Sequence, residues 1–402
     1  MTPVYNELIS ILEKGVVSEK YASQTRLGEE DWKKVLQLAK AHHILPIVAE
    51  SVWDTDALPS PAMQEKLKKS AMSRTIVQAS RTAEFLRVYD ALAEKGLRPA
   101  VLKGIVVRCL YPHPEQRESV DEDLLISPSE IRAYHKAFLA LGFTQNDDEN
   151  PDTAAEISYL SREKNLCIEL HKYPFPPEST AYGECNRCFR NALRRAVDVT
   201  CYDRSIRTLH PTDHLLYMIC HAYKHFLHGG VGIRQICDMG MLTKAYGGQM
   251  DWNYIYASCR GLRIEVFAAA MFKISTHLGF CMPDAFREIE TDEYDLLSDI
   301  LSGGLYGTAD VDRLHSSMIT LNTAAAYKNG KKKSRLIRTL FPAADSLTGR
   351  YPYLRDHSWL LPVAWTHRMI GYIKNRKRVD PKRSLQIGKE RVQLLKEYGV
   401  ID

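Results

Sequence analysis

The sequence predicts an α+β fold in which a central unit of strands and helices lies between two helical regions. Short apolar segments alternate with helical segments between residues 98 and 172, which is typical of a sheet covered by helices. Helical periodicity dominates residues 5–53 and most of the chain after the proline-rich break at 173–177. We therefore expect an N-terminal helical segment (1–69), a central core (70–180) and a C-terminal helical domain (181–402).

Each element is expected from its local pattern. Apolar residues recur at helical spacing from Leu67 to Tyr89, which predicts a long helix over 63–95, and Gly96 is suited to end it. The run from His210 to Asp213 supplies a start signal for a helix over 213–228. The central strands are expected at 99–102, 120–126, 156–161 and 166–171, with helices at 104–110 and 129–141 and a turn at 162–165.

Composition and charge restrict the classes of function. The 402 residues are 45% hydrophobic, enough to bury the cores of two or three domains. The net charge of +5 permits an anionic ligand but is far below the dense positive charge of a dedicated nucleic-acid binder. DNA is therefore not expected as a partner.

The sequence carries no pattern for export or membrane insertion. Its start lacks the basic, apolar and small-residue segments of a secretory signal. The apolar stretch at 359–373 contains His367 and Arg368 and is too short to span a bilayer. Nine cysteines, an odd number, fit reduced thiols better than a disulfide framework. We expect a cytoplasmic protein without a membrane partner.

The most informative motif is acidic. If 120–126 is a strand, Asp121 and Asp123 project from the same face. Glu169 and His171 share a face of the strand expected at 166–171, so Glu169 could join the pair from a neighbouring strand. Carboxylates suit Mg²⁺, and two such ions can clamp a transferring phosphoryl group. Against this, acidic side chains on a strand edge are usually solvated.

Glu122 conflicts with the pattern of its own strand. It lies on the face where Val120, Leu124 and Ile126 are expected to pack. A charge there must reach solvent or find a cationic partner such as Arg108 or Arg117.

A second motif lies where the strand at 99–102 meets the following helix. Lys103 and Gly104 occupy the junction, where backbone N–H groups and a cation favour an anion such as a triphosphate. A plain helix cap is the alternative interpretation of these two residues.

Together these residues resemble the uncharacterised bacterial nucleotidyltransferase family of the DNA polymerase β-like superfamily. The resemblance covers most of the chain, and the acidic motifs are its most specific part. It is carried by the segments 101–104, 111–112, Arg117 with 121–126, 168–171, 31–46, 209–214 with His221 and Asp238, and 340–342.

The resemblance implies a minimal nucleotidyltransferase mixed sheet with flanking helices. Asp121 and Asp123 match the acid pair that holds two Mg²⁺ ions, and Glu169 matches a third acid that ligates metal or serves as a base. Lys103 and Gly104 stand where the superfamily usually has Gly-Ser at its phosphate-binding turn. Glu122 departs from the family, whose members commonly carry an apolar residue there.

The activity expected from these parts is Mg²⁺-dependent transfer of a nucleoside monophosphate from an NTP to a hydroxyl-bearing acceptor. Arg117 would help Lys103 neutralise phosphate charge. His171 and His221 are expected beside the nucleotide. The acceptor is open: a small molecule, a protein or RNA. Two other functions stay open, a non-catalytic nucleotide-binding or antitoxin-like regulator and a phosphotransferase using the same pocket.

Other patterns give weaker signals. His214, His221, His225 and His228 lie near one face of the helix at 213–228, which either lines the pocket or is an ordinary polar face. A single CxxC at 185–188 is a poor zinc signal. Basic clusters at 328–335 and 374–383 are typical of solvated surfaces, with RNA as the alternative partner.

Overall fold

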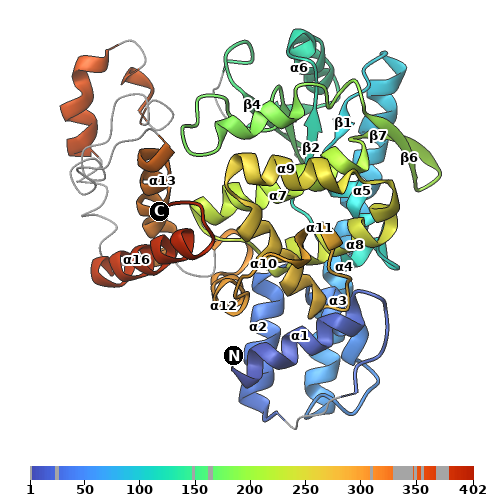
Figure 1. Ribbon diagram of the computed structural model, residues 1–402. Coiled ribbons are helices and arrows are strands. Elements are labelled where there is room, and N and C mark those ends of the chain that lie inside the picture. The colour runs from blue at the N-terminus through green and yellow to red at the C-terminus, as the bar shows by residue number, and fades with distance from the viewer. Residues whose placement is uncertain are drawn as a thin grey trace.

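A seven-stranded mixed sheet forms the centre of the computed structural model, which confirms the α+β prediction (Figure 1). The structure describes residues 2–22, 27–146, 150–161, 166–307, 311–328, 347, 351–354, 357–367 and 380–402. The strands are β1 (Ala100–Val101), β2 (Asp121–Leu125), β3 (Phe143–Gln145), β4 (Glu156–Ser161), β5 (Cys167–His171), β6 (Val197–Cys201) and β7 (Arg204–Thr208). Their order in the sheet is β3-β4-β5-β2-β1-β7-β6.

Helices precede, cover and follow this sheet. Before and within it lie α1 (Pro3–Gly15), α2 (Glu29–Ala41), α3 (Leu45–Val52), α4 (Pro61–Glu94), α5 (Gly104–Arg108) and α6 (Ile131–Ala140). After it lie α7 (Pro211–His228), α8 (Ile233–Tyr246), α9 (Trp252–Leu262), α10 (Glu265–Thr276), α11 (Asp284–Arg287), α12 (Tyr294–Gly303), α13 (Val311–Lys328) and α16 (Pro381–Glu397). Short 3₁₀ helices are η1 (Pro114–Gln116), η2 (Pro128–Glu130), η3 (Gly183–Phe189), η4 (Gly247–Gln249), η5 (Leu305–Gly307), η7 (Pro352–Leu354) and η8 (Ser358–Leu360).

The long helix α4 joins the N-terminal helices to the sheet. Figure 1 shows α1 to α3 and the sheet at opposite ends of the molecule, with α4 running between them. Ser60 begins the helix by accepting a hydrogen bond from the Met63 N–H, and Pro61 fits its first turn. The predicted stop at Gly96 is confirmed, since this glycine takes a positive φ of 74° just past the helix.

The two faces of the sheet belong to different cores. Leu124 and Ile126 pack with the second half of α4 and with α6, whereas Leu125 packs with the helices that follow the sheet. Because side chains alternate along a strand, Asp123 lies on the same face as Leu125. The acidic face of β2 is therefore the one that the C-terminal helices cover.

The pairing of β2 with β5 brings the two acidic motifs together. The strands run parallel, and Asp123 lies opposite Glu169 in register. On its other side β5 pairs with β4 in the expected antiparallel hairpin, whose turn at 162–165 lies outside the described residues.

Three features differ from the sequence prediction. The region after 180, expected to be helical, supplies the hairpin β6–β7, whose turn residues Tyr202 and Asp203 adopt φ values of 48° and 60°. This hairpin completes the sheet, because β7 pairs in parallel with β1. The short strand β3 was not expected either. Val120, expected to be packed, is 48% exposed because it lies just before β2 begins.

Some expectations fall on residues that are not described. These are most of the basic clusters at 328–335 and 374–383, and the segment 340–342. The described part of the chain holds no helix that combines the length and hydropathy needed to cross a bilayer. The expected domain boundaries stay predictions.

Candidate active site

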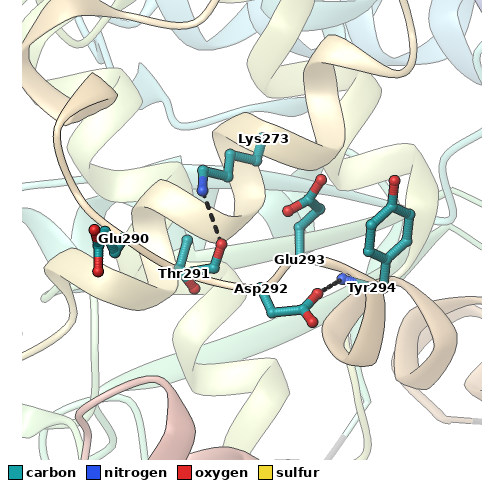
Figure 2. Close-up of a pocket in the computed structure, with 6 residues that line it drawn as sticks. All are labelled: Lys273, Glu290, Thr291, Asp292, Glu293 and Tyr294. Carbon is teal, nitrogen blue, oxygen red and sulfur yellow. Dashed lines mark hydrogen bonds between the residues drawn. The ribbon is translucent and has the colours of Figure 1, made fainter.

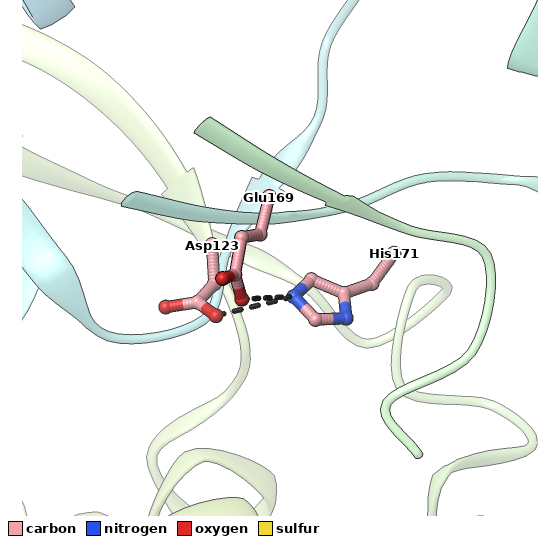
Figure 3. A group of neighbouring side chains, drawn as sticks. All are labelled: Asp123, Glu169 and His171. Carbon is pink, nitrogen blue, oxygen red and sulfur yellow. Dashed lines mark hydrogen bonds and ion pairs between the residues drawn. The ribbon is translucent and has the colours of Figure 1, made fainter. Parts of the chain in front are cut away.

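Asp123, Glu169 and His171 converge on the face of the sheet that the C-terminal helices cover. One ligand atom from each lies within 4.8 Å of the others, and Figure 3 shows both carboxylates pointing toward the Nε2 edge of the imidazole. Parallel pairing places Asp123 beside Glu169, and His171 follows two residues later on the same face. Within the described residues, no other group of three or more His, Cys, Asp or Glu side chains meets this spacing.

A buried ion pair fixes Asp123. Its Oδ2 lies 2.8 Å from Lys103 Nζ, and its Oδ1 accepts a hydrogen bond from His171 Nε2 at 3.1 Å. Burial opposes ionisation of Asp123, but the positive charge of Lys103 and the bond from His171 outweigh it and hold the pKa of this carboxyl well below its usual range. Burial likewise opposes the charge of Lys103, yet Asp123 raises the pKa of Lys103 well above its usual value. Both groups therefore stay charged.

Glu169 has the opposite electrostatics. Burial, followed by the negative charges of Asp123 and Glu156, raises the pKa of Glu169 to about 8. At neutral pH its carboxyl group therefore holds a proton, and a nearby cation would favour its ionisation.

His171 links the acidic group to the hairpin. Its Nε2 faces Asp123, and its Nδ1 lies 3.3 Å from Oε2 of Glu156. Burial would lower the pKa of His171, but Glu156 and then Asp123 raise it. The ring thus bridges two carboxylates and holds Asp123 in place.

Asp121 lies at the edge of this group. It begins β2 on the same face as Asp123 and is half-buried, opposite Cys167 in register. Its charge contributes to the raised pKa values of Lys103 and Glu169. Its carboxylate is not among the converging ligand atoms, where His171 takes the third place.

Glu122 occupies the N-terminus of α5. Its Oε2 accepts a hydrogen bond from the Ile105 N–H at 2.8 Å, and its Oε1 lies 2.5 Å from the buried Arg108 guanidinium. Of the two partners expected for Glu122, Arg108 is therefore the one it contacts. Gly104 has a φ of 51°, and a Cβ there would lie 1.9 Å from Glu122 Oε2. The glycine is required by this carboxylate.

Arg117 and His221 line a small cavity together with Lys103. Arg117 makes a bidentate pair with Asp238 of α8, at 3.1 Å from Nε to Oδ1 and 2.6 Å from Nη2 to Oδ2. His221 Nε2 lies 3.2 Å from Lys103 Nζ and 3.1 Å from His225 Nε2. Burial, and next the charge of Lys103, lowers the pKa of His221 well below its usual value, so the neutral ring accepts from the ammonium.

The other histidines of α7 have separate partners. His214 lies 3.4 Å from Thr208 Oγ1, and His228 lies 3.2 Å from Tyr182 Oη. Among the described residues, neither is close enough to the acidic group to contribute a ligand atom.

A surface depression outside the acidic group is poorly suited to bind a nucleotide. It has a volume of about 600 Å³ and lies between α10 and the loop that precedes α12 (Figure 2). Its one lysine, Lys273, donates to the backbone oxygen of Thr291 at 2.8 Å. Glu290, Asp292 and Glu293 line the same depression and would repel phosphate groups.

Several residues near the acids were not expected from the sequence. Glu156 could have been found, because the hairpin register pairs it with His171. Arg234 of α8 and Tyr306 of η5 come close to Lys103 only through folding, and no local motif marks them.

Comparisons with known proteins identify a family. Neither the search of curated proteins nor that of solved structures found a match. A family model described as uncharacterised nucleotidyltransferase matches residues 28–279, more than half of the chain, and this range includes every site residue expected from the sequence. The chain therefore belongs to this family of nucleotidyltransferases.

Proposed function

We propose that the protein transfers a nucleoside monophosphate from an NTP to a hydroxyl-bearing acceptor with the help of Mg²⁺. The observation that carries this proposal is the convergence of Asp123 and Glu169 beside Lys103 in the interior of a nucleotidyltransferase. A cytoplasmic location, where NTP and Mg²⁺ are present, is part of the proposal.

The residues at the site fit a hard divalent cation. Asp123 Oδ2 is buried and has no aligned hydrogen-bond donor among the described residues, although Lys103 lies beside it. Asp121, Asp123 and Glu169 offer the oxygen ligands that Mg²⁺ prefers. Two Mg²⁺ ions, when bound, would neutralise charge on the attacking and leaving oxygens.

The chain's own groups would bind and orient the reactants. Lys103 and Arg117 would balance the negative charge of the phosphates. His171 orients Asp123 through the bond to Oδ1, and His221 orients the Lys103 ammonium. Glu169, when ionised, would take the proton of the acceptor hydroxyl.

Transfer of label from NTP tests this function and its class. Purified protein is incubated with Mg²⁺, a cell extract and NTP labelled on either the α- or the γ-phosphate. We expect α-label in one extract fraction, and that fraction shows whether the acceptor is a small molecule, a protein or RNA. Transfer of γ-label alone would mean a phosphotransferase. Binding of NTP without any transfer would mean a non-catalytic binding protein.

Asp123→Asn and Glu169→Gln are expected to lower α-label transfer at least a hundredfold, and circular dichroism of each variant checks that it is folded. The control is Asp198→Asn, since Asp198 lies in an exposed pair with Arg98, 3.0 Å away. Transfer that persists at the wild-type rate in both site variants would contradict the proposal.

A further inference from the structure

A small buried cavity lies next to Lys103, between the sheet and the helices that cover it. Its volume is about 20 Å³, room for one oxygen-sized group. Its lining comes from Lys103 just before α5, from Arg117 just after η1, and from α7, α8 and η5. The charged members are Lys103, Arg117, Arg234 and Asp238.

The cavity has an excess of positive charge. Lys103 is paired with Asp123, and Arg117 is paired with Asp238. Arg234 is only 4% exposed and has no carboxylate partner among the described residues, where its Nη1 donates to the backbone oxygen of Glu118. Asp238 lies near enough to interact electrostatically with Arg234, but it is already paired with Arg117, so one positive charge is left over. Buried charge that is not balanced is costly, so this arrangement favours an anionic ligand.

Two buried donors also lack acceptors. Arg117 Nη1 and Arg234 Nε have no hydrogen-bond partner within the described residues, and both side chains line the cavity. Leaving such a donor unpaired costs roughly 1–3 kcal/mol, more when it is charged. An anionic oxygen in the cavity would offer these donors an acceptor.

At the turn between β1 and α5, the backbone N–H group that would bind a phosphate already has a hydrogen-bond acceptor. Glu122 accepts the N–H at the start of α5 and is neutralised by Arg108. The phosphates of a nucleotide must therefore find their donors elsewhere. Lys103 contacts Asp123 and also lines the cavity. A polyphosphate whose first phosphate is bound at the acidic residues would therefore extend along Lys103 toward the two arginines.

We propose that Arg117 and Arg234 form an anion subsite that binds one oxygen of the terminal phosphates of the donor nucleotide, and so of the pyrophosphate that its transfer releases. This inference rests on the proposed function, because it takes the acids as the place of the α-phosphate. A nucleoside monophosphate, which lacks the terminal groups, makes no use of the subsite.

Calorimetry with Mg²⁺ tests the subsite with three probes: pyrophosphate, tripolyphosphate and a nucleoside monophosphate. The variants are Arg234→Gln, Arg234→Lys and the control Arg132→Gln, whose side chain is 82% exposed beside Asp152. We expect Arg234→Gln to weaken binding of both polyphosphates at least tenfold, since a charged hydrogen bond is lost. Arg234→Lys should recover part of that loss, and the monophosphate should bind all forms equally.

Equal polyphosphate affinity in wild type and Arg234→Gln would overturn the subsite and mean that the cavity holds only water. If Arg234→Gln does not fold, Arg234→Lys decides, because the lysine cannot reproduce the Nε contact and must weaken tripolyphosphate. The proposed subsite and the proposed transferase activity can also be contradicted independently of each other. Polyphosphate binding that depends on Arg234 without label transfer would support the subsite alone, and label transfer without that dependence would support the transferase alone.

Discussion

Gly104 shows how one residue can be required by the chemistry of another. It combines a positive φ with a position where any Cβ would meet the Glu122 carboxylate. Glu122 in turn neutralises Arg108, which is fully buried. A charged residue in this strand is thus tolerated because a glycine and an arginine accommodate it.

Gly104→Ala is therefore expected to destabilise the fold strongly. A positive φ alone costs about 1 kcal/mol for alanine, and displacing Glu122 from Arg108 adds roughly 3–5 kcal/mol. Gly142→Ala is the matched control, because Gly142 has a φ of 84° with open space around it. Urea unfolding of both variants gives the difference. Equal losses of stability would mean that Glu122 adapts to the methyl group.

Prediction at the residue scale worked where the pattern was local. Strand alternation predicted that Asp121 and Asp123 share a face. The charge of Glu122 predicted either solvent or a cationic partner such as Arg108 or Arg117, and the structure shows Arg108. The partner of Arg117 could not be predicted in this way. Asp238 lies 121 residues away, and only the folding of the chain, with α8 packed against α5, brings them together.

At the scale of elements, β1 depends on distant segments for both neighbours. Its two residues pair with β2 on one side and, through Val101 and Thr208 alone, with β7 on the other. The Thr208 hydroxyl strengthens this junction by donating to the Val101 carbonyl oxygen at 2.6 Å. A short strand is thus secured by a side chain as well as by its backbone.

Thr208→Val is expected to destabilise the protein by about 1–3 kcal/mol, because it keeps the shape of the side chain but removes a buried hydrogen bond. Thr200→Val is the control, because it makes the same substitution at an exposed position of the edge strand β6, where that hydrogen bond is not involved. Thermal unfolding should show a lower midpoint for Thr208→Val than for Thr200→Val. Identical midpoints would show that the hydroxyl contributes nothing to the junction.

Elements with strong local signals were predicted well, and those that depend on partners were not. The helix α4 has thirty-four residues with caps at both ends, and its position was predicted to within two residues. β6 and β7 are five residues each and lie in a region of arginine-rich, weakly patterned sequence. Their stability comes from pairing with β1, which local periodicity cannot reveal.

At the scale of the whole molecule, His42 connects the N-terminal helices to the C-terminal region. It lies at the end of α2, where its Nδ1 accepts from the Ile233 N–H at 3.4 Å and its Nε2 faces the Leu301 carbonyl at 3.3 Å. This geometry requires a neutral ring. Burial, helped by the charges of Arg234 and Arg313, lowers the pKa of His42 to about 4 although the contact with the Leu301 carbonyl opposes this change.

Acid should therefore weaken the fold. Above the ordinary pKa of histidine the ring is neutral in both states, so it adds no pH dependence. As the pH falls from about 6.5 toward 4, the unfolded chain takes up the proton first, and roughly 3 kcal/mol of stability is lost through His42. Urea titrations across this range should show a shallower slope for His42→Gln than for wild type.

The exposed His113 provides the control variant, His113→Gln, for this experiment. An unchanged slope in His42→Gln would contradict the role of His42. The link itself was not predictable from the sequence, because Ile233 and Leu301 lie 191 and 259 residues from His42.

The position of β1 in the sheet also determines how long one of its edges stays unpaired while the chain is being synthesised. Val101 leaves the ribosome 107 residues before Thr208, its parallel neighbour. At roughly 5–20 residues per second, the nascent chain spends several seconds with one edge of β1 uncovered. A messenger RNA truncated before the codon for Thr208 would yield a polypeptide in which this edge of β1 stays unpaired. We expect such fragments to be bound by chaperones and degraded by proteases rather than to accumulate.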